Sequence, residues 1–249
     1  MATFVLVPGA WHGGWCWKRV TALLRAASHE VFAPTLTGLG ERSHLAGPNV
    51  NLSTHILDVE NLLTFEDLER VILVGHSYAG MVITGVAERA PDRLAQLVYL
   101  DAFVPEDGQA LVDIMAPEPQ QRAAMEERVR TEGHGWSLPS LRPGPWEPFL
   151  REHWRITDEA DLRWIMARLD PHPYATMTEA VRRANPTAAA LPRTYVRCAL
   201  VPHPHFDRFA ATAKRAGSGW RYREVASGHD AMVTAPHEVA ALLLELAQE

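Results

Sequence analysis

The stretch from Val71 to Gly80 constrains the fold of this chain more than any other. It begins with four apolar residues, continues into a Gly-x-Ser-x-Ala turn and leads directly into a helical pattern, Met81 to Arg89. A short apolar run of this kind is typical of a strand that is buried on both faces of a parallel sheet. The stretch therefore predicts a strand, a sharp turn and a helix, with Ser77 on the turn.

This turn favours a serine nucleophile. The hydroxyl of Ser77 can stand above the sheet only if small residues flank it, and Gly75, Ala79 and Gly80 meet that need. The usual motif has glycine where Ala79 stands, and alanine is the smallest chiral replacement. A serine that merely caps a helix is the alternative. The rest of the chain must therefore supply a base, an acid and oxyanion donors.

Length and composition suit one α/β domain with a full apolar core. The chain has 249 residues, 47% of them hydrophobic and 22% charged, and a formal net charge of −6. The Lys and Arg residues do not cluster in the sequence, so we expect no nucleic-acid partner. No apolar run approaches the ~18 residues of a membrane span, and no signal peptide is recognisable. We expect a cytoplasmic protein in which Cys16 and Cys198 are buried free thiols.

Strand-like and helix-like segments alternate, which predicts a doubly wound, mostly parallel α/β sheet. The expected strands are residues 3–7, 31–33, 71–74, 97–100, 194–200 and 220–225. The expected helices begin near residues 17, 53, 81, 206 and 236, with Ser53 as the cap of the second.

Residues 105–190 differ from the rest, because the segment contains frequent prolines, four of the eight tryptophans and only helical patterns. Helices are expected near residues 120–130, 147–154, 158–169 and 177–184, and no strand is expected. We therefore predict one structural domain, with a core of residues 1–104 and 191–249 and a helical cap of residues 105–190. A separate helical domain is the alternative.

A serine hydroxyl needs a general base within hydrogen-bond reach. The chain has twelve histidines, and His229 is the one on a loop between the final strand and the final helix. Stabilisation of the oxyanion should come from the N–H group of Tyr78, which follows the nucleophile, and from that of Ala10 or Trp11 in the early glycine-rich loop.

Two aspartates compete for the role of the acid behind His229. Asp101 ends an apolar strand, where a carboxylate needs a partner such as an imidazolium. Asp207 lies beyond the strand at residues 194–200, and we prefer Asp101 to it. Asp230 adjoins His229 in sequence and is poorly placed to hold that ring. His203, His205 and Asp207 do not form a recognised metal-ligand pattern, so we expect no metal and no cofactor.

The residues resemble the plant methylesterase and hydroxynitrile lyase branch of the α/β-hydrolases. Residues 4–15 read Phe-Val-Leu-Val-Pro-Gly-Ala-Trp-His-Gly-Gly-Trp, residues 74–77 read Val-Gly-His-Ser, and residues 228–232 read Gly-His-Asp-Ala-Met. The resemblance implies an α/β-hydrolase fold with Ser77 as nucleophile, His229 as base and the Ala10 and Tyr78 amides as oxyanion donors.

Three departures from that branch bear on the chemistry. Pro8 replaces a histidine, and the usual acid would fall near Val201, which cannot serve. Asp101 instead resembles the acid of one group of haloalkane dehalogenases.

In the lyases a hydroxyl residue stands at the position of Ala10 and a lysine at that of Asp230. Cyanohydrin cleavage needs a positive charge, so these positions favour an esterase.

These features predict a serine hydrolase that cleaves a small, apolar or aromatic carboxylic ester. The alternatives are a thioesterase or lactone hydrolase of secondary metabolism, a hydroxynitrile lyase-like enzyme, or a non-catalytic ligand receptor. The expected partner is a small-molecule ester, with no membrane partner, and a homodimer is left open.

Overall fold

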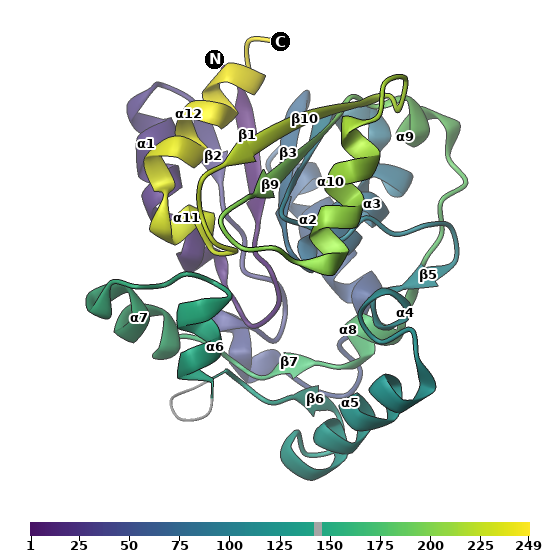
Figure 1. The fold of residues 1–249 in the computed structure, drawn as a ribbon. Coiled ribbons are helices and arrows are strands. Elements are labelled where there is room, and N and C mark those ends of the chain that lie inside the picture. Colours follow the sequence, from purple (N-terminus) through teal and green to yellow (C-terminus); the bar gives the residue numbers. More distant parts are fainter. Residues whose placement is uncertain (142–145) are drawn as a thin grey trace.

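A computed structural model of residues 1–249 describes residues 1–141 and 146–249. At its centre lies a six-stranded sheet with the strand order β10-β9-β4-β3-β1-β2, in which every neighbouring pair is parallel (Figure 1). The strands are β1 (Thr3–Val7), β2 (Glu30–Phe32), β3 (Val71–His76), β4 (Leu94–Leu100), β9 (Arg193–Cys198) and β10 (Trp220–Val225). The predicted α/β fold is thus confirmed.

The sheet is buried on both faces, as the apolar run of β3 predicts. Val71 and Leu73 pack into one core, whereas Ile72 and Val74 pack into the other because successive side chains of a strand point to opposite faces. The first core also receives α2 (Leu52–Phe65), α3 (Ala79–Arg89) and α10 (Pro204–Lys214). The second receives α1 (Lys18–Ala26), α11 (Ala231–Thr234) and α12 (Pro236–Leu246).

Several helix starts differ from the sequence-based expectation, and helix α3, for example, begins at Ala79 and not at Met81. The cap of α2 is Asn51 and not Ser53, because the Asn51 side chain accepts a 3.0 Å hydrogen bond from the N–H of Thr54. Helix α10 begins at Pro204, since proline fits the first turn of a helix. Asp207 consequently lies within that first turn and not on a loop.

Residues 105–190 contain helices and two very short strand pairs. The helices are α4 (Leu111–Met115), α5 (Pro119–Glu132), α6 (Glu147–Glu152), α7 (Glu159–Met166), α8 (Ala175–Thr178) and α9 (Pro186–Ala190). Strand β5 (Gln109–Ala110) pairs with β8 (Ala180–Val181), and β6 (Ser137–Leu138) pairs with β7 (His172–Pro173). The expectations of no strand in residues 105–190 and of a helix over residues 177–184 are therefore wrong. Strands of only two residues that pair with distant segments leave no periodic pattern in the sequence.

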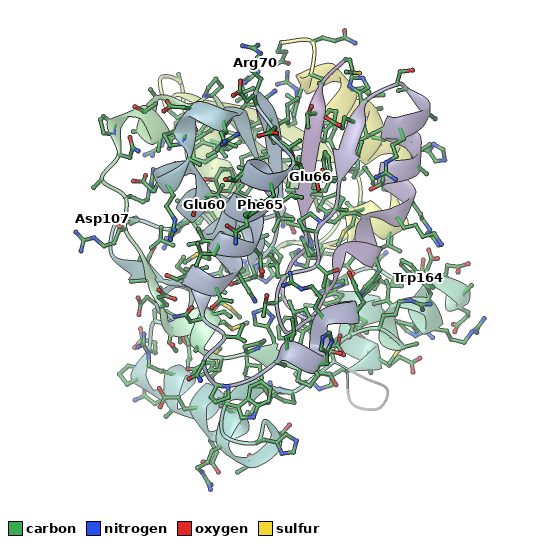
Figure 2. All side chains as sticks on the ribbon, turned by 180° about the vertical axis from the view of Figure 1, so that it is seen from behind. Glu60, Phe65, Glu66, Arg70, Asp107 and Trp164 are labelled. Atoms are coloured by element: carbon green, nitrogen blue, oxygen red, sulfur yellow. The ribbon has the colours of Figure 1, made fainter. Side chains whose placement is uncertain are left out.

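Both termini lie on the side of the molecule away from residues 105–190 (Figure 1). Seen from behind, the side chains of Arg70 and Asp107 extend from the edge of the molecule (Figure 2). Cys16 and Cys198 are buried and unpaired with each other, as predicted. Among the helices of the described residues, none has both the length and the apolar character that a membrane crossing requires.

Candidate active site

The turn after β3 places Ser77 in a strained backbone conformation. Ser77 has a φ of +54°, in the left-handed region that costs a non-glycine residue about 1–2 kcal/mol. Its carbonyl accepts hydrogen bonds of 3.1 Å from the N–H groups of Gly80 and Phe103, which hold the turn. Strained residues that the surrounding structure holds in place are common at active sites.

Close backbone contacts explain the small residues around this turn. A Cβ atom on Gly80 would lie 1.9 Å from the carbonyl oxygen of Phe103, and one on Gly75 would lie 2.8 Å from that of Ala79. Ala79 itself is fully buried in the core beside the sheet. The departure from the usual motif is therefore accommodated at Ala79, whereas Gly75 and Gly80 have no room for a side chain.

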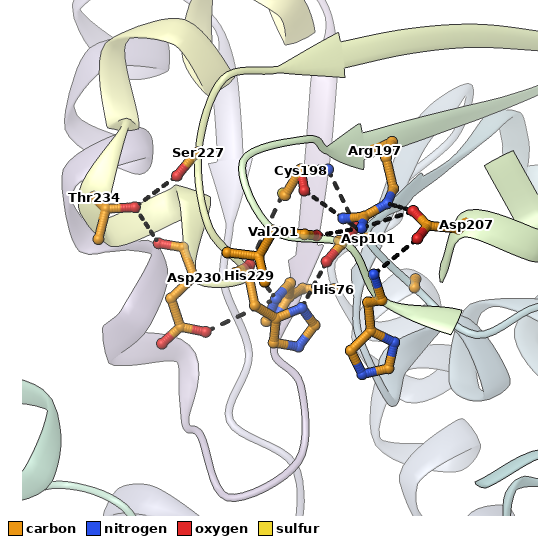
Figure 3. Close-up of polar contacts among 12 residues, drawn as sticks. His76, Asp101, Arg197, Cys198, Val201, Asp207, Ser227, His229, Asp230 and Thr234 are labelled. Carbon is orange, nitrogen blue, oxygen red and sulfur yellow. Dashed lines mark hydrogen bonds and ion pairs between the residues drawn. The ribbon is translucent and has the colours of Figure 1, made fainter. Parts of the chain in front are cut away.

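Three contacts hold His229 in place. Its Nδ1–H donates a 2.8 Å hydrogen bond to Oδ2 of Asp101, at the end of β4 (Figure 3). Its main-chain carbonyl accepts a 2.9 Å hydrogen bond from Nε2 of His76. The ring of Phe206 stacks on the His229 ring, with centroids 5.0 Å apart and planes 12° apart. The position and the orientation of the imidazole are thus both restrained.

One arginine binds both aspartates that the sequence leaves in competition. Arg197, in β9, donates from Nη1 to Oδ1 of Asp101 at 2.8 Å and from Nε to Oδ1 of Asp207 at 2.9 Å (Figure 3). Asp101 also accepts a 3.1 Å hydrogen bond from the N–H of Cys198. Only Asp101 reaches His229, whereas half of the Asp207 side chain is exposed. Of the two, Asp101 has the geometry of an acid behind the base.

These contacts keep the buried Asp101 carboxylate ionised. Burial by itself raises the pKa of Asp101, but the hydrogen bond from His229 and the charges of His229 and Arg197 lower it below the usual value. Asp101 also has a φ of +43°, and its N–H donates a 2.7 Å hydrogen bond to the carbonyl of Val196. The carboxylate is therefore fixed as well as charged.

Asp230 pairs with a different histidine. Its Oδ2 accepts a 3.2 Å hydrogen bond from Nε2 of His12, and both side chains are buried. Nδ1 of His12 lies 2.8 Å from the carbonyl of Ala10. Burial lowers the pKa of His12, but the charge and hydrogen bond of Asp230 raise it overall. A doubly protonated His12 therefore donates to both groups and connects the loop of Ala10 with the residue after His229.

The two candidate oxyanion donors of the early loop differ in their contacts. The N–H of Trp11 donates a 3.3 Å hydrogen bond to Nδ1 of the buried His172, so in this structure the N–H of Ala10 is the better placed of the two. Burial lowers the pKa of His172 well below its usual value, which keeps the ring neutral and able to accept. Within the described part of the chain, the N–H groups of Ala10 and Tyr78 make no hydrogen bond.

Ser77 and His229 line one cavity of about 240 Å³. Its wall is mostly apolar and aromatic, and residues 105–190 contribute much of it, including Met115, Trp146, Phe149, Trp154 and Met177. The oxyanion candidates Ala10 and Tyr78 line it too. The arrangement brings a hydroxyl, an imidazole and two backbone N–H groups to one apolar space.

The described residues include one group with three side chains close enough to share a metal ion, namely His76, His229 and Asp230. One polar atom of each side chain already has another partner, whereas Nδ1 of His76 and Oδ1 of Asp230 have no hydrogen-bond partner among the described residues. His76 donates to the carbonyl of His229, His229 donates to Asp101, and Asp230 accepts from His12. The contacts of His76 and Asp101 hold His229 in place.

The sequence did not indicate four further residues of the site, Arg197, His12, His76 and His172. An arginine inside the apolar strand Thr194 to Cys198 was the available signal for the first, because a buried charge requires a partner. His76 lies in the Gly-His-Ser turn, and His12 lies in the glycine-rich loop. No local pattern marks His172, whose partner Trp11 is 161 residues away in the chain.

Comparison with known proteins agrees with the observed fold. Residues 4–242 match the family described as "Alpha/beta hydrolase family". The chain is 41% identical to a "Carbendazim hydrolyzing esterase" of Nocardioides sp. (strain SG-4G), an alignment that covers 99% of this chain and 100% of that protein.

More distant relatives agree in fold. "Putative methylesterase 15, chloroplastic" of Arabidopsis thaliana is 24% identical, over 78% of this chain but only 45% of that protein. The solved structure of an extracellular alpha/beta-hydrolase from a Paenibacillus species has a TM-score of 0.78 at 23% identity and covers 98% of both chains. The match along nearly the whole chain therefore shows an enzyme that belongs to the alpha/beta hydrolase family and resembles its esterases.

Proposed function

We propose that this protein is a serine esterase that hydrolyses small apolar or aromatic carboxylic esters through Ser77, His229 and Asp101. The observation that carries the proposal is the 2.8 Å hydrogen bond from His229 to the buried Asp101, at a cavity that both His229 and Ser77 line. A base oriented by a carboxylate next to a serine is the arrangement that acyl transfer requires.

In the proposed mechanism, Ser77 Oγ attacks the ester carbonyl while Nε2 of His229 takes its proton. The ionised Asp101 stabilises the resulting imidazolium and keeps the proton of Nδ1 in place. The N–H groups of Ala10 and Tyr78 stabilise the oxyanion, each by about 3–4 kcal/mol. His229 then protonates the leaving alcohol, and a water molecule activated by His229 cleaves the acyl-enzyme.

The wall of the cavity supports an apolar substrate. Trp11, Trp146 and Trp154 line it, whereas Trp136 and Trp164 lie outside it. We propose that residues 105–190 act as the cap that shapes this space. The relatives named for carbendazim hydrolysis and for methylester cleavage make carbendazim and aryl methyl esters suitable test substrates.

The lyase alternative gains no support from the contacts of Asp230. The residue after His229 is a buried carboxylate bound to His12, and no lysine stands there to stabilise departing cyanide. Thioesters and lactones remain candidate substrates, because the same nucleophile and oxyanion donors serve all acyl groups.

The test is pre-steady-state turnover of p-nitrophenyl acetate combined with labelling by a fluorophosphonate. We expect a burst of p-nitrophenol and a covalent adduct on Ser77, both lost in Ser77→Ala. A parallel panel of aryl, methyl and thioester substrates and carbendazim ranks the substrate classes. Slow, burst-free turnover that persists in Ser77→Ala would contradict the proposal.

A further inference from the structure

A second hollow lies beside the active-site cavity. It has a volume of about 260 Å³ and lies between α5 and the segment Leu138–Pro139. Trp11, Met115 and Arg128 line both spaces. These three side chains are therefore the partition between the cavity of Ser77 and the second hollow.

The partition has one fixed side and one adaptable side. Trp11 is fixed, because its indole Nε1–H donates a 3.2 Å hydrogen bond to the carbonyl of Pro139 and its main-chain N–H donates to His172. Met115 and Arg128 have long unbranched side chains that can change rotamer. The guanidinium of Arg128 lies over the Trp146 ring, 4.7 Å from its centroid, and its ion pair with Glu132 is long at 3.7 Å.

The second hollow has the chemistry of a site for an apolar group. Arg128 is the one charged residue among its described lining residues, and its guanidinium lies over the Trp146 ring. Ala124 and Met125 of α5 line it together with Leu138 and Pro139, and Gln121 adds an amide. No carboxylate is among its lining residues within the described chain. Trp11 directly follows Ala10, so the hollow adjoins the loop that supplies the proposed oxyanion donor.

We propose that the second hollow is a substrate subsite that receives the distal apolar part of the ester, so that the preferred substrates extend beyond the group held in the first cavity. This inference rests on the proposed esterase function. The distal part is an alkyl chain or an aromatic ring that passes between Trp11 and the pair formed by Met115 and Arg128. It belongs to either the acyl or the alcohol side, and the two arms of the test distinguish them.

The first arm uses p-nitrophenyl esters from acetate to octanoate, and the second uses benzoate esters from methyl to hexyl alcohol. Once the chain reaches the second hollow, kcat/KM should rise in one arm by up to about fourfold for each added methylene, the value expected for burial of a CH₂ group. A profile that falls steadily with length in both arms would overturn the subsite.

Variants of two adjacent exposed alanines on α5 provide a matched comparison. Ala124→Trp fills the second hollow, whereas Ala123→Trp adds the same side chain at a neighbouring position that does not line it. We expect the hexanoate-to-acetate ratio of kcat/KM, or the corresponding ratio in the alcohol arm, to fall at least about tenfold in Ala124→Trp. A tenfold fall in this ratio corresponds to the loss of about two buried methylene groups. The ratio should stay at the wild-type value in Ala123→Trp.

Gln121→Trp is a second filling variant, which keeps the test decisive if Ala124→Trp folds poorly. Equal ratios in the filling and control variants would contradict the subsite. The proposed function fails separately, because in that case wild-type protein would neither turn over p-nitrophenyl acetate through Ser77 nor react with the fluorophosphonate.

Discussion

Asp101 and His229 are separated by 128 residues, yet a 2.8 Å hydrogen bond joins the carboxylate of the first to Nδ1 of the second. Asp101 follows β4 and His229 follows β10, so both stand at the carboxyl ends of parallel strands. That edge of a parallel sheet is where ligand sites form. Arg197, from β9 between these two strands, completes the contact by binding the other oxygen of Asp101.

The relation between Asp101 and the base predicts unequal effects of two isosteric substitutions. Asp101→Asn should lower kcat by roughly 10⁴-fold, as loss of the acid does in a serine triad. Asp207→Asn should lower it less than about tenfold, because Asp207 is half exposed and reaches the site only through Arg197. Steady-state kinetics on both variants, with circular dichroism to verify folding, measures the difference. The opposite order would assign the role to Asp207.

Replacement of Arg197 should change both stability and pH dependence. Arg197→Met leaves the buried Asp101 without its cation, which costs about 3–5 kcal/mol of unfolding free energy. Without that positive charge the pKa of Asp101 rises, because the charge of Arg197 helps to lower it, so the acidic limb of kcat/KM should move to higher pH. Urea unfolding and a pH–rate profile measure the two effects. In Arg197→Lys, which keeps the charge, the limb should stay at its wild-type position.

The close contacts of the turn at Ser77 predict that glycine is required at position 80 but not at position 79. Gly80→Ala places a Cβ atom 1.9 Å from the carbonyl of Phe103, so we expect a loss of about 2 kcal/mol or more in unfolding free energy and a large loss of activity. Ala79→Gly restores the usual motif and should change stability by no more than about 1 kcal/mol. Thermal unfolding and esterase rates compare them, and equal destabilisation by both changes would contradict this account.

Three buried neutral histidines predict a loss of stability in mild acid. Burial lowers the pKa of His55 to about 4, that of His76 to about 3 and that of His172 well below its usual value. As the pH falls below about 6.5, the unfolded chain therefore takes up protons that the folded chain does not, and unfolding becomes more favourable. Each histidine contributes about 2 kcal/mol of this loss at pH 5.

His12 acts in the opposite direction. Its pKa is raised, so its contribution is present below the ordinary histidine pKa and is lost as the pH rises through the raised value. His12 therefore offsets part of the loss that the other three cause between pH 7 and pH 5. Urea unfolding at pH 7, 6 and 5 measures it, and His55→Gln should flatten the dependence. A free energy of unfolding that does not change over this range would contradict the prediction.

The local features of the site follow from the sequence alone. The apolar run of β3, the small residues around Ser77 and the alternation of strands with helices depend on near neighbours in the chain. The same is true of the loop that carries His229, between the last strand and the last helices. Periodicity and steric limits decide such features, and both can be counted along the sequence.

Tertiary structure alone decided which groups meet. Arg197 binds both competing aspartates across the sheet end, but only Asp101 reaches His229. The N–H of Trp11 is taken by His172, a residue that no nearby pattern connects with the loop. Partners separated by about a hundred residues or more are set by the order and register of the strands. Whether a buried polar group finds a partner there is a property of the folded sheet.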